Sequence, residues 1–196
     1  MNPIYAAASE IQLFCRDRDW RFFFIGGLAV QRWGEPRFTR DVDVTIVSGF
    51  GGEATFVDGL LSGFRARLPD AREFALRNRV VLLASSEGIP IDVALGAMPF
   101  EEEAVRRASA FEVAPGVGLT TCSAEDLVVL KAFAGRDRDW LDIEGIVARQ
   151  GPRLDEALVW RELRPLLRLK EDIATEGRLH RLFADARDPA RRSPEA

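Results

Sequence analysis

The sequence predicts an α+β fold in which a small mixed sheet is flanked by helices and followed by a C-terminal helical region. In residues 1–120, short apolar or β-branched runs alternate with stretches of helical spacing. Residues 121–187 have helical spacing almost throughout. The last segment, 188–196, is rich in proline and arginine and is expected to be a disordered tail. We therefore expect a core domain over 1–120 and a helical region over 121–187.

The first half of the expected core alternates helices with strands. Apolar residues at helical spacing predict helices, and short aromatic or β-branched runs predict strands. Glycine and proline mark the turns between them. The elements expected up to residue 67 are helices at 3–16, 28–33 and 53–67 and strands at 21–25 and 42–47.

A hairpin is expected next, followed by the helical region. Residues 79–84 and 89–95 are two apolar runs separated by Ser-Ser-Glu-Gly, which is typical of a turn between antiparallel strands. A short helix at 101–108 and a short strand at 111–114 complete the core. The helices expected after it are 124–134, 137–149, 154–170 and 171–187.

Composition excludes several classes of protein. The formal net charge of −4 gives no global basic field for nucleic acid. One histidine and two distant cysteines, Cys15 and Cys122, argue against a zinc site and a disulfide framework. No apolar run is long enough to span a bilayer, and the N-terminus does not resemble a signal peptide. We expect a cytoplasmic protein with no membrane association.

Two glycines, Gly26 and Gly27, stand between an expected strand and an expected helix. Glycine leaves the backbone N–H groups unobstructed, and the N-terminus of a helix attracts anions. The pair therefore predicts a phosphate-binding turn.

Two aspartates follow, at the start of the strand 42–47. Because side chains alternate across a strand, Asp41 and Asp43 share one face, and the valines between and after them point to the core. Two adjacent carboxylates repel each other unless a cation lies between them. Mg²⁺, or Mn²⁺ in its place, is the hard cation that suits such oxygen ligands.

A third carboxylate, Asp92, is the only charge in the apolar run 89–95. Such a carboxylate needs a partner, which can be an arginine or a metal ion shared with Asp41 and Asp43. It can also act as a base toward an acceptor hydroxyl. These three aspartates are the predicted catalytic and metal-binding residues.

The order Gly-Gly, Asp-x-Asp and a later Asp resembles the nucleotidyltransferase superfamily, which includes DNA polymerase beta, the CCA-adding enzymes and the aminoglycoside nucleotidyltransferases. The second glycine, Gly27, is present, but the serine that is common in many members is missing, and Leu28 follows instead. The resemblance implies a nucleotidyltransferase fold and an enzyme that uses a nucleoside triphosphate, ATP among them.

Residues 22–148 are most similar to the AbiEii-like nucleotidyltransferases of toxin–antitoxin systems. The similarity lies in Arg-x-Thr-Arg-Asp-x-Asp at 37–43 and in two stretches of the helical region, Asp-Leu-Val-Val-Leu-Lys at 126–131 and Ala-Gly-Arg-Asp-Arg-Asp at 134–139. It implies that Lys131 contacts the triphosphate and that Asp139 or Asp142 assists. From the residues alone, these two aspartates are more typical of a solvated helix face.

The reaction implied is transfer of a nucleoside monophosphate (NMP) to an acceptor hydroxyl, with Gly26, Gly27, Arg40 and Lys131 holding the nucleotide. A tRNA or other RNA is the first acceptor considered, and it predicts a basic patch from Arg32, Arg37 and Arg40. Arg37 and Arg40, which flank the carboxylates, can equally just balance the charge of the aspartates. The alternatives are an aminoglycoside-type small molecule, a partner protein such as a cognate toxin or antitoxin, and a non-catalytic binding module.

Overall fold

The structure, a computed structural model, describes residues 2–187 and divides the chain into two compact units. The first consists of Met1–Arg32 and Arg37–Ser123, and the second of Trp33–Pro36 and Ala124–Ala196. Each unit is described by itself below. The expected disorder of 188–196 falls outside the described residues. In residues 2–187, no helix has the length and apolar character needed to cross a membrane.

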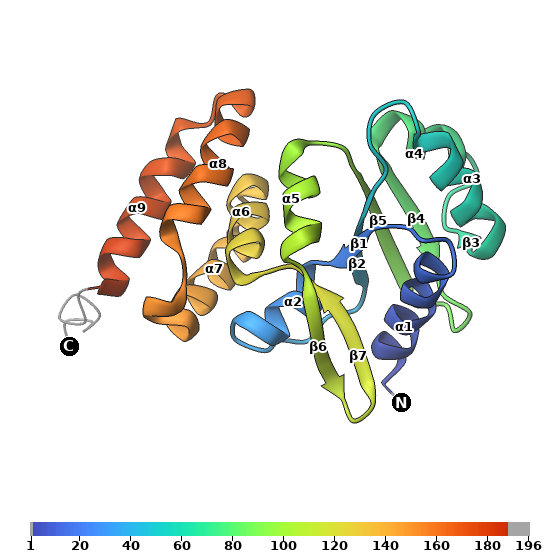
Figure 1. The fold of residues 1–196 in the computed structure, drawn as a ribbon, viewed down its shortest axis with the longest axis horizontal. Helices are drawn as coiled ribbons and strands as arrows, with labels where there is room; N and C mark the ends of the chain where they lie inside the picture. The colour runs from blue at the N-terminus through green and yellow to red at the C-terminus, as the bar shows by residue number, and fades with distance from the viewer. Residues whose placement is uncertain (1, 188–196) are drawn as a thin grey trace. The chain divides into compact units, whose positions relative to one another are not determined.

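The first unit is built on a mixed sheet (Figure 1), which in the described residues has seven strands. Its spatial order is β3-β4-β5-β2-β1-β7-β6. The pairs β2·β5 and β1·β7 are parallel, and the other neighbours are antiparallel. The strands are β1 (Phe22–Phe24), β2 (Val42–Val47), β3 (Arg65–Ala66), β4 (Val80–Ala84), β5 (Pro90–Gly96), β6 (Ser109–Ala114) and β7 (Val117–Thr121).

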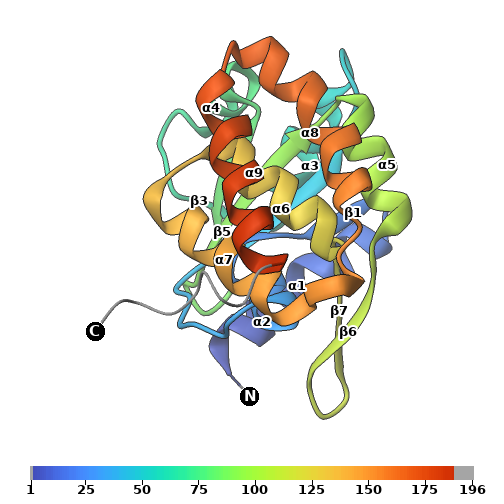
Figure 2. The same cartoon turned by 90° about the vertical axis from the view of Figure 1, so that its left-hand side faces the viewer.

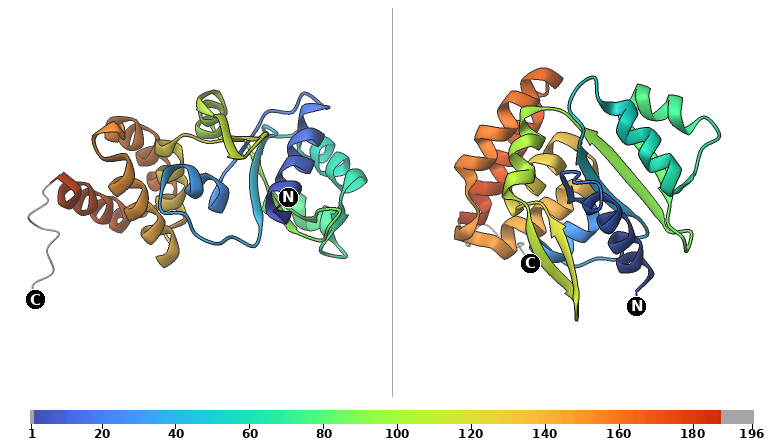
Figure 3. Two further views of the ribbon diagram at one scale, coloured as in Figure 1. Left: turned by 90° about the horizontal axis from the view of Figure 1, so that it is seen from below. Right: turned by 45° about the vertical axis from the view of Figure 1, so that its right-hand side comes forward.

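Helices lie on both sides of this sheet. In the left view of Figure 3, α1, α3 and α4 lie on one side of the strands and α2 and α5 on the other. The first helix starts where Asn2 accepts a hydrogen bond from the Ile4 amide at 2.9 Å, with Pro3 in its first turn. The helices are α1 (Pro3–Arg16), α2 (Gly26–Trp33), α3 (Glu53–Gly63), α4 (Ala71–Asn78) and α5 (Pro99–Arg107).

The main hydrophobic core lies on the α1 and α3 side of the central strands. Val42, Val44 and Ile46 of β2 are fully buried there, together with Ile11 of α1 and Leu60 of α3. Each such side chain stabilises the fold by about 1.5–3 kcal/mol relative to full exposure. The strict alternation of β2 therefore fixes which of its residues face the opposite side.

The opposite face of β2 and β5 carries the polar residues. Asp43 and Thr45 alternate with the buried valines of β2, and Asp92 alternates in the same way with the buried residues of β5. The α5 helix covers the far end of this face, where a Cβ on Gly96 would lie 3.0 Å from Glu101. The aspartates lie at the other end of the strands.

The second unit is helical (Figure 2). Its α6 helix packs against α7 and α8, and α9 contacts α7 and α8. The segment Trp33–Pro36 belongs to this unit because it lies against α7, where Arg149 donates to the Gly34 carbonyl at 2.7 Å. The elements are α6 (Ala124–Ala134), α7 (Asp137–Gln150), a 3-10 turn (Gly151–Arg153), α8 (Glu156–Lys170) and α9 (Ile173–Arg187).

The α+β class, the mixed sheet flanked by helices and the following helical region are confirmed. Four elements were not predicted: β3, α4, β7 and the 3-10 turn. The expected helix 53–67 is wrong at its C-terminal end, because α3 stops at Gly63 and the chain then turns into β3. The α2 helix begins at Gly26 itself rather than after the glycine pair.

Candidate active site

Asp43 and Asp92 lie side by side on the polar face of the sheet. They are register partners in the parallel pair of β2 and β5. Neighbouring strands lie about 4.8 Å apart, and register partners project to the same face. Two carboxylates 49 positions apart in the numbering are thus adjacent because of this one strand pairing.

The start of α2 is packed against the carboxylate of Asp43. Gly26 has φ +57°, and a Cβ built on it would lie 1.9 Å from Asp43 Oδ2. The Ile25 amide, immediately before it, donates to the Asp43 carbonyl at 3.0 Å. Both the left-handed backbone and the close approach require glycine at this position. The phosphate-binding turn expected from the sequence therefore lies directly against one predicted metal ligand.

Gly27 likewise leaves space for a neighbouring side chain, in this case Thr39. A Cβ on Gly27 would lie 2.5 Å from Thr39 Oγ1. That hydroxyl donates to Asp41 Oδ1 at 2.8 Å, and Thr39 itself is buried. Asp41 lies just before β2 begins. Its side chain is therefore oriented by Thr39, which fits there because Gly27 has no side chain.

Asp92 is held by an arginine. Arg67, which follows β3, donates a hydrogen bond from its guanidinium to Asp92 Oδ1. Burial raises the pKa of the Asp92 carboxyl above its ordinary value, and the negative charge of Asp41 adds to this, whereas Arg67 opposes it. The influence of Asp41 on this pKa indicates that the Asp41 and Asp92 carboxylates share one electrostatic environment.

The three aspartates fit a hard divalent ion in donor type, since they offer carboxylate oxygens from adjoining positions. Their side chains are not closed around a common point. Among residues 2–187, no group of three or more acidic, histidine or cysteine side chains is arranged to hold a metal ion. Asp92 is turned to Arg67, and Asp41 to Thr39. The strand pairing thus places two of the predicted ligands, Asp43 and Asp92, next to each other, while the side chains of Asp41 and Asp92 are hydrogen-bonded to other residues.

The loop before Asp41 presents an aromatic ring and a cation. Phe38 is 76% exposed, which is unusual for so large an apolar side chain. The guanidinium of Arg40, also exposed, lies 6.0 Å from the Phe38 ring centroid. Arg37 is half-buried. The basic patch expected here thus contains Arg40 with an exposed ring beside it.

Arg32 does not belong to that patch. Its guanidinium donates to the Ser109 carbonyl and to the Thr121 hydroxyl, both at 2.9 Å. Burial lowers its pKa. Arg32 therefore ties α2 to β6 and β7, which is a structural role.

In the second unit, Lys131 meets two aspartates inside the helical bundle. Its Nζ donates to Asp142 Oδ2 at 2.6 Å and to Asp139 Oδ1 at 3.2 Å. All three residues are buried, with exposures of 5% for Lys131, 3% for Asp139 and 6% for Asp142. The expectation that Asp139 and Asp142 lie on a solvated helix face is wrong, because that face of α7 packs inward and the lysine compensates their charge.

Arg136 closes the cluster from its rim. Its Nε donates to Asp139 Oδ2 at 2.7 Å. Burial raises the pKa of Asp139, but the hydrogen bond from Arg136 and the positive charge of Lys131 outweigh it, so the pKa lies below its ordinary value. Asp139 is therefore ionised in the folded protein over the physiological range.

Two residues of the site were not assigned a role from the sequence. Thr39 stood inside the Arg-x-Thr-Arg-Asp motif, and its signal was its position two residues before Asp41. Arg67 gave no signal, because it was placed at the end of an expected helix. Its contact with Asp92 depends on the antiparallel pairing of β3 with β4 and of β4 with β5.

The fold is similar to solved nucleotidyltransferase structures. The antibiotic-resistance factor ANT(2'')-Ia is 18% identical, with 90% of this chain and 97% of that chain covered and a TM-score of 0.50. An antigenic nucleotidyltransferase-like protein from Paracoccidioides brasiliensis is 15% identical, with 88% of each chain covered and a TM-score of 0.48. At these identities the likeness concerns the fold alone.

No curated protein sequence matches the chain. The family described as "Nucleotidyl transferase AbiEii toxin, Type IV TA system" matches residues 13–191. That match covers both units, including Gly26, the three aspartates and Lys131. The chain therefore belongs to the AbiEii nucleotidyltransferase family and is a nucleotidyltransferase.

Proposed function

We propose that this protein transfers an NMP from a nucleoside triphosphate to a hydroxyl group of an RNA acceptor, with tRNA as the first candidate. The observation that carries the proposal is the register of Asp43 beside Asp92, with the glycine turn at Gly26 against the Asp43 carboxylate. The glycine turn, which we propose binds phosphate, and a pair of acidic side chains thus lie next to each other on the sheet.

The side chains divide the work between nucleotide and metal. Gly26 and Gly27 receive phosphate oxygens at the start of α2, and Arg40 is proposed to neutralise the triphosphate. Lys131, to which the resemblance gave the same role, is buried on Asp139 and Asp142 in the second unit, and its proposed role is to stabilise that unit. Asp41, Asp43 and Asp92 would hold Mg²⁺ or Mn²⁺. Such an ion, when bound, neutralises the charge that develops on the attacking and leaving oxygens.

Asp92 is the proposed general base. Its carboxylate takes the proton from the acceptor hydroxyl, whose oxygen then forms a bond to the α-phosphorus as the bond to pyrophosphate breaks. The raised pKa of Asp92 brings its basicity closer to that required near neutral pH. Asp43, which is adjacent to Asp92, is proposed to take no part in this proton transfer and to hold the metal ion beside the nucleotide.

An RNA acceptor is favoured over a cationic small molecule by the loop before Asp41. Phe38 offers an exposed ring on which a base can stack, and the exposed Arg40 beside it offers a charge for the phosphodiester backbone. A cationic antibiotic would instead require an acidic acceptor pocket. Arg40 and Phe38 do not provide one.

The family's description also supports a place in a toxin–antitoxin pair. We propose that the chain acts in the cytoplasm and is opposed by a cognate antitoxin protein. Induced expression without that partner should then arrest growth, and Asp43→Asn should relieve the arrest.

The test is to incubate the purified protein with each of the four labelled nucleoside triphosphates, Mg²⁺ and total RNA, tRNA, an aminoglycoside or a protein lysate. We expect label in the tRNA fraction. Asp43→Asn should abolish it, and Asp70→Asn, at an exposed helix start, should retain it. Label that persists in Asp43→Asn would refute the assigned site, and label confined to protein or small molecules would refute the RNA acceptor.

A further inference from the structure

Arg67 lies in one row across the sheet with two of the proposed metal ligands, Asp92 and Asp43. The Arg67 amide donates to the Leu82 carbonyl at 3.0 Å, continuing the pairing of β3 with β4. Leu82 is the register partner of Asp92 in β5, and Asp92 is the partner of Asp43 in β2. The guanidinium of Arg67 thus reaches along this row to Asp92 on the face where the carboxylates lie.

The ion pair between Arg67 and Asp92 is exposed enough for another cation to replace Arg67. The side chains of Arg67 and Asp92 are 32% and 36% exposed, so water and salt reach both groups. Half-exposed pairs of this kind contribute little to folding, and their loss is readily compensated by another cation. By contrast, the buried Lys131 pairs with Asp139 and Asp142 cannot be opened without leaving charges unpaired.

We propose that Arg67 is an internal counter-cation that occupies Asp92 in the metal-free protein and competes with a divalent ion for it. The inference rests on the proposed function, since it assumes that Asp41, Asp43 and Asp92 bind the ion. It explains why the backbone aligns the carboxylates although no closed set of ligands is found among residues 2–187. Binding of the ion would require the guanidinium to leave Asp92 Oδ1.

Arg65 offers a matched control. It lies two residues before Arg67 on β3, so its side chain projects to the same face, and it is exposed. Its guanidinium lies near the Gly88 turn, where Nη2 would be 3.8 Å from a Cβ on Gly88. Arg65→Met therefore removes the same charge two residues earlier in the chain without touching Asp92.

The experiment is a titration of the full chain with Mn²⁺ alone, without nucleotide, followed by electron paramagnetic resonance of the free ion. Arg67→Met should bind Mn²⁺ about three- to tenfold more tightly than the wild type, because both the competing pair and a nearby positive charge are gone. Arg67→Lys and Arg65→Met should remain within about twofold of the wild type.

The outcomes separate the two proposals. If Asp43→Asn abolishes Mn²⁺ binding but Arg67→Met leaves it unchanged or weaker, Arg67 positions Asp92 rather than competing for it, and this inference is overturned while the proposed function stands. If the wild type binds no Mn²⁺ and Asp43→Asn changes nothing, the proposed metal site itself is overturned. Thermal unfolding of each variant without Mn²⁺ shows whether it is folded.

Discussion

Gly26 and Asp43 are packed so closely that a methyl group on Gly26 would lie 1.9 Å from Oδ2 of Asp43. Gly26→Ala should therefore displace the Asp43 carboxylate as well as strain the backbone at φ +57°. We expect a stability loss of more than about 1–2 kcal/mol and a loss of transfer activity of roughly 100-fold, since misplacement by about 1 Å has effects of that order. Urea unfolding and labelling of the acceptor measure the two quantities.

Gly116→Ala is the control for the effect of backbone strain alone. Gly116 also has a positive φ, +75°, but a Cβ there would have no neighbour within 4 Å. It should lose about 1–2 kcal/mol of stability and keep its activity. Equal activity in the two variants would show that contact with Asp43 does not matter.

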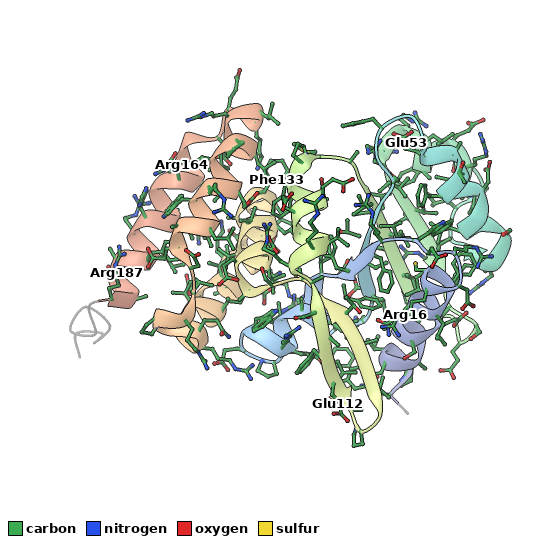
Figure 4. All side chains as sticks on the ribbon, viewed as in Figure 1. Arg16, Glu53, Glu112, Phe133, Arg164 and Arg187 are labelled. Atoms are coloured by element: carbon green, nitrogen blue, oxygen red, sulfur yellow. The ribbon has the colours of Figure 1, made fainter. Side chains whose placement is uncertain are left out.

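Lys131 should be essential to the second unit because it pairs with two buried carboxylates. Lys131→Met leaves Asp139 and Asp142 buried without that cation, and breaking such a cluster costs about 3–5 kcal/mol. Lys170→Met is the comparison, since Lys170 is exposed and donates to the Phe133 carbonyl at 2.8 Å (Figure 4 labels Phe133). It should cost about 1 kcal/mol or less. Similar losses for both lysines in chemical denaturation would contradict this account of the cluster.

The lowered pKa of Asp139 predicts acid sensitivity. Although burial raises this pKa, Arg136 and Lys131 bring it below the unfolded value. A depressed carboxyl pKa contributes stability above the unfolded pKa, and this contribution is lost as the pH falls through the folded value. The difference in unfolding free energy between wild type and Asp139→Asn should therefore be constant above about pH 5 and shrink as the pH falls below that value and through the folded pKa. A difference independent of pH would refute the ionised state.

Cys15 should be chemically inert in the folded protein. Burial raises the pKa of its thiol to about 12, and the thiolate is the reactive form. Cys122 is also buried, and neither cysteine forms a disulfide. A thiol reagent such as dithionitrobenzoate should react with neither in native buffer and with both in denaturant. Fast reaction of one thiol under native conditions would show that its helix or strand opens locally.

The sequence was sufficient to predict an element and its buried face where the periodicity of apolar residues matches the packing of the strand or helix. The alternation in β2 and β5 correctly separated the buried residues from Asp43 and Asp92 because each strand has one apolar face. It failed for α4, which buries only Ala71 and Ala75, and for β7, a short strand that Gly118 interrupts. Those elements are stabilised by neighbours that the sequence does not reveal.

The partners of the charged residues were also difficult to predict, because they depend on contacts between elements. Asp139 and Asp142 share a helical face with Ile143 and Ile146, so their spacing did contain a sign of burial, but their charge was given more weight. Arg67 reaches Asp92 through two strand pairings, and no local pattern encodes such a contact. Similarly, the hydrogen bond from Thr39 to Asp41 depends on the space that Gly27 leaves open.

The assignment of Trp33–Pro36 to the helical unit bears on how the protein can be divided. The chain changes units after Arg32, after Pro36 and after Ser123, and Gln150 of α7 donates to the Trp33 carbonyl at 2.6 Å. A fragment ending at Ser123 would thus strand these four residues without their packing partner, a few positions ahead of Thr39 and Asp41. Neither unit can therefore be exchanged or removed independently of the other. Replacing or deleting the helices of the second unit should disturb the loop that contains Asp41.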